Sequence, residues 1–138
     1  MAVDPERVAE VDEWLAKANG DLRGASVDLA AAPPLTGDAM FHAQQGTEKA
    51  LKAFLSWHDV PFRKTHDIAE LGRACVAIDA TLEAVAAPAA VLTEFAWRFR
   101  YPGDATEPSA AEAHEAVDLA TAVVAAVTER LGRARRAG

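Results

Sequence analysis

The stretch "FHAQQGTEKALKAFLSWHDVPFRKTHDIAELG", residues 41–72, decides the fold. Gly37-Asp38 precedes it and sets up the start of a helix that we expect to run from about Ala39 to Trp57. A second helix is expected just after Thr65-His66-Asp67, where Thr or Asp can cap the first free amides. Its apolar side chains repeat at steps of three and four: Ile68, Leu71, Cys75 and Ile78. The stretch therefore predicts two helices joined by a polar loop.

The segments on either side are helical as well. Upstream, an apolar stripe from Val8 to Leu29 predicts a long helix that Pro33-Pro34 ends. Downstream, Leu82 to Arg100 is helical in character, but Pro88 predicts a break near Ala87. A capping box and a last apolar stripe follow a loop: Ser109 to Glu112, then Ala113, Val117, Ala120, Val124, Val127 and Leu131. No window alternates with period two, so we predict an all-α fold.

Long amphipathic helices with short connections favour an up-and-down antiparallel bundle, here of four to five helices. A length of 138 residues suits a single domain, which we place at residues 1–138. Hydrophobic residues make up 51% and charged residues 25%, which excludes a disordered chain. No apolar run approaches the ~20 residues of a membrane span, and the acidic N-terminus does not fit an export signal. We therefore expect a cytoplasmic domain without membrane contact.

Charge and metal-binding residue types narrow the function. A net charge of −7 argues against a surface coated with nucleic acid, so any anion site must be local. Cys75 is the single cysteine, which excludes an internal disulfide and a cysteine-based zinc cage, and we expect it to be a small buried residue. The four histidines are scattered and form no pair at metal spacing. We expect no metal and no cofactor.

Polar residues form a second stripe along the helix expected at 39–57. The stripe consists of His42, Gln45, Lys49, Lys52 and Ser56, at steps of three and four. Such a stripe can face another subunit or a ligand groove. A solvated face is the alternative, because Glu48 and Lys52 form an i, i+4 pair in the favourable order.

Two polar loops are expected to meet at one pole of an up-and-down bundle. They are residues 63–67 and residues 98–104. Two helix N-termini point their free amides there, which suits a phosphate. The predicted ligand-binding residues are Lys49, Lys52, Lys64, Thr65, His66, Arg98, Arg100 and Tyr101. Surface salt bridges of Arg98 and Arg100 with Glu94 or Asp104 are the alternative.

Three segments in this order resemble the HEPN family, the nucleotide-binding domains of higher eukaryotes and prokaryotes. They are "FHAQQGTEKALKAFL" at 41–55, "KTHDIAEL" at 64–71 and "RYPGD" at 100–104. The resemblance implies a helical bundle that often dimerises and is commonly encoded beside a minimal nucleotidyltransferase. In several branches it implies the toxin half of a toxin–antitoxin pair.

Many HEPN toxins resemble metal-independent ribonucleases in which a His follows an Arg by four to six residues. The present chain departs from that pattern, because Arg63 precedes His66 by three positions and the first His after Arg98 and Arg100 is His114. Catalytic residues therefore stay unassigned, and we lean against an enzyme. If RNA is cleaved, His66 is the candidate acid or base, and Arg98 or Arg100 would stabilise phosphate charge.

Three readings follow from the sequence. The leading one is a homodimeric module that binds a nucleotide or RNA phosphate, a nucleotidyltransferase partner, or both. The second is a ribonuclease toxin. The third is a structural helical dimer without a ligand.

Overall fold

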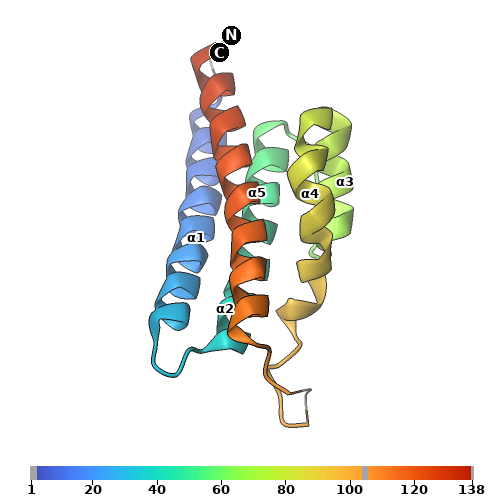
Figure 1. Cartoon of the computed structure of the whole chain (residues 1–138). Coiled ribbons are helices and arrows are strands. Elements are labelled where there is room, and N and C mark those ends of the chain that lie inside the picture. The colour runs from blue at the N-terminus through green and yellow to red at the C-terminus, as the bar shows by residue number, and fades with distance from the viewer. Residues whose placement is uncertain (1–2, 104–105, 138) are drawn as a thin grey trace.

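A computed structural model describes residues 3–103 and 106–137, and every regular element in these ranges is a helix. The first, α1, spans Pro5–Ala30, and the second, α2, spans Thr36–Trp57. They are followed by α3 at Ile68–Ile78, a 3₁₀ turn η1 at Ala80–Leu82, α4 at Glu83–Ala89, the 3₁₀ helix η2 at Ala90–Ala96 and α5 at Ala110–Ala137. The predicted all-α bundle is confirmed (Figure 1).

The start of α2 lies three residues before the predicted one, and the reason is a distant carboxylate. Leu35 stands at the N-cap and offers no side-chain hydrogen bond. Instead, the amide of Gly37 donates to Oε2 of Glu107 at 3.0 Å, from a residue 70 positions away. Because Glu107 satisfies a free amide of the first turn, the helix begins at Thr36 without a local cap.

The connection between α2 and α3 sets the direction of the second half of the bundle. α1 and α2 are antiparallel, and α2 ends near the two chain termini (Figure 1). Residues 58–67 then run back along the bundle, so α3 starts beside η2, where the amide of Ile68 donates to Oγ1 of Thr93 at 3.0 Å. α3 therefore runs in the same direction as α2, and α4 with η2 returns before α5 rises to the termini.

Pro88 does not end the helix near Ala87, where the sequence predicted a break. α4 continues through it to Ala89 and then tightens into η2. Pro88 sits in the last turn of a seven-residue helix, so its missing N–H removes at most one helical hydrogen bond. The inward face that follows is as predicted for Leu92 and Phe95, which are buried.

The core is centred on α2, which packs on both α1 and α5. Its largest fully buried side chains are Phe54, Leu51, Leu55, Ile68, Leu71, Leu82, Leu92 and Leu131. Alanines fill the contact between α1 and α2, where Ala18, Ala25 and Ala43 are completely buried. Cys75 is buried as predicted. Among the described residues, no helix has the length and apolarity needed to cross a membrane.

Candidate functional site

His66 stands at the centre of a polar network on the outer side of α2. Its Nδ1 lies 2.7 Å from Oε1 of Glu48, and its backbone oxygen accepts from Nε2 of Gln44 at 3.1 Å. Gln44 also donates to Glu48 at 3.1 Å, and Nζ of Lys52 donates to the other Glu48 oxygen at 2.9 Å. We call these four residues the His66 network. It holds an imidazole with a 61% exposed side chain on a carboxylate whose side chain is 6% exposed.

The carboxylate of Glu48 stays charged despite its burial. Burial acts to raise the pKa of Glu48, but the hydrogen bonds from Lys52, His66 and Gln44 outweigh it and hold that pKa below its usual value. A charged Glu48 favours a proton on Nδ1 of His66, which leaves Nε2 as the outward nitrogen. In the neutral ring the exposed Nε2 can accept a proton, and the ring that has accepted it can donate a hydrogen bond to an anion.

Lys52 is enclosed rather than presented to a ligand. Its side chain is 9% exposed, and its Nζ lies 5.6 Å from the ring centroid of Trp14 and 5.7 Å from that of Phe62. The two rings and Glu48 together take up the charge of this lysine. Lys52 belongs to the support of His66, in contrast to the ligand-contacting role that we predicted for it.

The single polar pole expected from the sequence does not form. Because residues 58–67 run back along the bundle, His66 lies beside the middle of α2, whereas the loop after η2 lies at the end of the bundle farther from the termini (Figure 1). Arg63 pairs with Glu70 at 2.8 Å on the surface. Thr65 accepts from the amide of Asp67 at 3.0 Å, and Lys64 is exposed beside it.

The arginines of the second loop have acidic partners of their own. Arg98 pairs with Glu94 at 3.0 Å, which is the surface salt bridge considered as an alternative above. Arg100 lies 3.7 Å from an oxygen of Asp38, and its guanidinium carbon is 3.7 Å from the ring centroid of Phe41. Tyr101 is 66% exposed. Asp104, the other expected member, lies outside the described residues.

The polar stripe of α2 faces α1 over much of its length. Lys49 pairs with Oδ2 of Asp21 at 2.6 Å, and Nδ1 of His42 lies 2.9 Å from the other oxygen of the same carboxylate. Ser56 reaches Glu10 at 3.5 Å. The stripe therefore joins two helices of one chain, and Lys49 is held within that seam.

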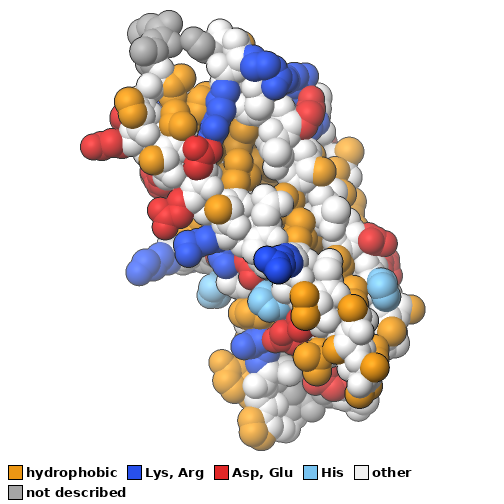
Figure 2. Space-filling model, turned by 90° about the vertical axis from the view of Figure 1, so that its left-hand side faces the viewer, with side chains coloured by type: hydrophobic (Ala, Val, Ile, Leu, Met, Phe, Trp, Pro, Cys, Tyr) orange, Lys and Arg blue, Asp and Glu red, His pale blue; other side chains and the backbone are white. Residues whose placement is uncertain are grey.

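A second group of titratable residues was missed by the sequence analysis. Asp28 at the end of α1, with Asp38 and His42 on the first turns of α2, places three potential ligand atoms within 4.8 Å of one another. We call these three residues the acidic cluster. The available signal in the sequence was the i, i+4 spacing of Asp38 and His42, which puts a carboxylate and an imidazole on one helix face. Figure 2 shows histidine, acidic and basic side chains gathered over the lower half of the α1 side.

Comparison with known proteins agrees with this architecture. The chain resembles the crystal structure of an archaeal HEPN homologue with a TM-score of 0.67 and 24% identity, over 87% of this chain and 96% of that one. At this identity the likeness establishes an all-helical bundle of that fold. No curated protein matched the chain. The profile of the HEPN domain matches residues 11–131, so the chain belongs to the HEPN domain family.

Proposed function

We propose that this HEPN domain is a cytoplasmic binding module that holds the phosphate of a nucleotide or of RNA at the His66 network. The observation that carries the proposal is the exposed imidazole of His66, fixed through Nδ1 by the buried carboxylate of Glu48 at 2.7 Å. A ring oriented in this way loses little freedom when its outward nitrogen binds an oxyanion. When protonated, it offers a charge-assisted hydrogen bond.

Lys64 supplies a second cation two residues before His66. The described residues contain no ion pair or hydrogen bond of its side chain, whereas Arg63, Arg98 and Arg100 are each paired with a carboxylate. A phosphate that binds beside His66 can therefore pair with Lys64 without competing against a carboxylate among the described residues. Arg98 and Arg100 keep further N–H donors, but Glu94 and Asp38 already balance part of their charge.

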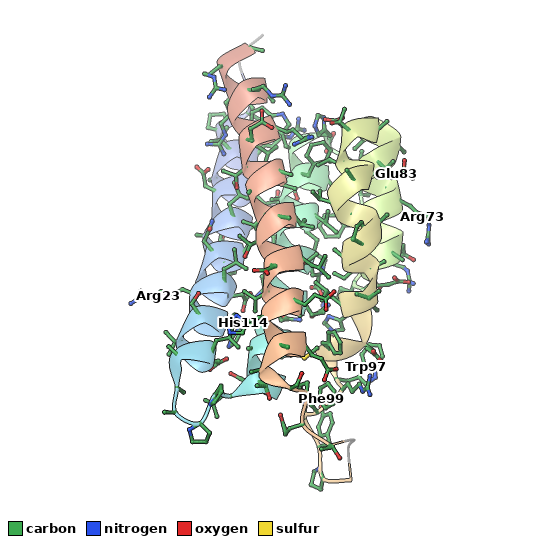
Figure 3. The ribbon with its side chains drawn as sticks, viewed as in Figure 1. Arg23, Arg73, Glu83, Trp97, Phe99 and His114 are labelled. Carbon is green, nitrogen blue, oxygen red and sulfur yellow. The ribbon has the colours of Figure 1, made fainter. Side chains whose placement is uncertain are left out.

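Thermal unfolding in the presence of AMP, ATP, GTP or a short RNA tests the proposal. A ligand at ~100 times its dissociation constant adds about 2.7 kcal/mol to the free energy of unfolding. We expect His66→Ala and Lys64→Ala to remove that stabilisation. His114→Ala is the matched control, because His114 is an exposed histidine on α5 outside the network (Figure 3). A stabilisation that survives both variants would place the ligand elsewhere.

The pairing of Glu48 with His66 also favours a second candidate, a metal-independent ribonuclease. A carboxylate that holds one imidazole nitrogen leaves the other able to take a proton from a ribose 2′-hydroxyl. Incubation of the protein with RNA, and with DNA of the same sequence as a control for the 2′-hydroxyl, tests this candidate. Cleavage should fall at least a hundredfold in His66→Ala. Persistent cleavage in that variant would trace the activity to a contaminant or to another residue.

Two protein partners are proposed, a minimal nucleotidyltransferase and a second copy of this chain. The family resemblance supports a minimal nucleotidyltransferase partner and a toxin–antitoxin role, which growth arrest on expression of the chain alone would test. A homodimer is supported by two exposed large apolar side chains, Val91 on η2 at 63% and Trp97, directly after η2, at 53%. Val91→Asp should then convert a dimer to a monomer in light scattering. A monomeric wild-type chain would rule the homodimer out.

A further inference from the structure

We propose that the acidic cluster of Asp28, Asp38 and His42 is a binding site for a divalent transition-metal ion, independent of phosphate binding at His66. The outer nitrogen of His42, Nε2, lies 3.5 Å from Oδ2 of Asp38 and 4.0 Å from Oδ2 of Asp28. Two ligands that each sit at ~2.0–2.2 Å from a zinc ion are separated by roughly 3–4 Å. The cluster thus has the spacing of a set of metal ligands.

The orientation of His42 is fixed by a residue behind it. Nδ1 of His42 lies 2.9 Å from Oδ1 of Asp21, a carboxylate whose side chain is 11% exposed. A carboxylate that accepts the other ring N–H of a histidine is the usual support of a metal-bound imidazole, since it sets the tautomer and leaves the opposite nitrogen as the ligand. Here it directs Nε2 toward Asp28 and Asp38.

A buried oxygen beside Nε2 of His42 lacks a partner, and the ring itself packs closely on α1. Oδ2 of Asp28 is a buried oxygen without a hydrogen-bond partner, on a side chain that is 10% exposed. Gly24 lies on the same face of α1, and a Cβ built on it would stand 3.1 Å from Nε2 of His42. The same Cβ would stand 3.2 Å from each of the two ring carbons beside Nε2, so glycine at this position lets the imidazole pack directly against α1. A cation bound at Nε2 would satisfy the buried oxygen of Asp28.

Neighbouring cations do not already fill this role. Lys49 binds Oδ2 of Asp21 at 2.6 Å, behind the imidazole, and Arg100 lies 3.7 Å from Oδ1 of Asp38. Neither of these cations pairs with the oxygens that face Nε2 of His42, which are Oδ2 of Asp28 and Oδ2 of Asp38. A protonated His42 would have one N–H for two carboxylates, at distances beyond an ordinary hydrogen bond.

Two carboxylates lie close together at the cluster, because Oδ2 of Asp28 and Oδ2 of Asp38 both face Nε2 of His42. Like charges held this close repel each other. A divalent ion bound between them would relieve that repulsion.

The chemistry of the ligands selects the ion. One imidazole nitrogen with two carboxylate oxygens suits Zn²⁺ or Mn²⁺, while Mg²⁺ prefers oxygen ligands alone and retains its waters. The side chain of Asp38 is 46% exposed, so an ion can enter from solvent and keep a water as a further ligand.

Titration of the metal-free chain with Zn²⁺ at pH 7.5 tests the proposal, with calorimetry and thermal unfolding as readouts and Mg²⁺ as the comparison ion. We expect one Zn²⁺ per chain, a raised midpoint of unfolding, and little response to Mg²⁺. His42→Ala and Asp38→Asn should each weaken binding at least tenfold. Asp38→Asn also serves if His42→Ala does not fold, because Asp38 lies at the surface.

His66→Ala is the matched control, since His66 also pairs with a carboxylate but lies outside the acidic cluster. Its affinity for Zn²⁺ should equal that of the wild-type chain. With Co²⁺ as a probe, visible absorption bands should appear in the wild-type chain and in His66→Ala but not in His42→Ala. Absence of Zn²⁺ binding to the wild-type chain at ~1 mM, or undiminished binding in both cluster variants, would overturn the proposal.

Discussion

Glu48→Gln should be among the most destabilising polar substitutions in this chain. The variant keeps the size and much of the shape of the side chain but removes the charge that faces Lys52 at 2.9 Å. Both side chains are less than a tenth exposed, so the ammonium group of Lys52 would stay buried without its counter-ion. Breaking a buried pair from one side costs about 3–5 kcal/mol.

The surroundings of Lys52 lower that figure. Its Nζ stays within 6 Å of the rings of Trp14 and Phe62, contacts that retain about 1 kcal/mol. We therefore expect a loss of about 2–4 kcal/mol, or roughly 6–16 °C in a domain of this size. Lys52→Met should cost less, about 1–2 kcal/mol, because Glu48 keeps its hydrogen bonds from His66 and Gln44. The combined variant should lose less than the sum of the two.

Urea unfolding followed by circular dichroism at pH 7 measures these differences, and the pH dependence gives a second check. The pKa of Glu48 is lowered in the folded state, so its contribution is present above the unfolded value of ~4.3 and is lost as the pH falls through the folded value. The gap between the wild-type chain and Glu48→Gln should therefore shrink below about pH 4. A Lys52→Met variant that is less stable than Glu48→Gln would refute the reasoning.

Three further predictions concern single residues. Glu107→Ala should destabilise the chain by about 1 kcal/mol, since its carboxylate caps α2, whereas Glu115→Ala on the exposed face of α5 should be neutral in the same urea titration. Cys75, whose pKa burial raises to about 12, should resist alkylation at pH 8 until the chain unfolds, and fast labelling of the native chain would contradict its burial. The pKa of Asp28 is raised to about 6 in the folded state, so between about pH 4 and 6 the folded state binds more protons than the unfolded state. The free energy of unfolding should therefore fall as the pH rises from about 4 to 6. Asp28→Asn should flatten this fall when urea midpoints are measured with EDTA present.

The helices were predictable because each carries an apolar stripe that its own sequence shows. The start of α2 was misplaced by three residues, since its cap comes from Glu107 and no local pattern reveals a cap 70 positions away. The direction of α3 was not predictable either. A loop of ten residues can cross the end of a bundle or run back along it, and the hydrogen bonds of Gln44 and Thr93 to residues 66 and 68 select the second path.

The residues of the candidate site were partly predictable, but the contacts between them were not. The prediction selected His66 and Lys64 because polar residues cluster in one loop, but the sequence did not show that Lys52 and Glu48 would be enclosed beneath them. In the sequence, Glu48 is visible only as the i, i+4 partner of Lys52, which is equally consistent with a solvated face. Its partner His66 is 18 positions away, and that contact exists only because the loop returns to α2.

The seam between α1 and α2 links the fold to the acidic cluster. The helices pack closely at this seam, since a Cβ on Gly46 would lie 3.3 Å from the backbone oxygen of Ala18. The buried alanines are small and similar in shape, so apolar packing alone does not select one register of α2 against α1. A shift of α2 by one turn, ~5.4 Å, would keep small residues in contact but would separate Asp21 from His42 and Lys49. Each such shift leaves a buried carboxylate unpaired, which is strongly unfavourable. The same contacts that select the register therefore hold Nε2 of His42 toward Asp28 and Asp38, and a protein that folds in this register presents the cluster already assembled.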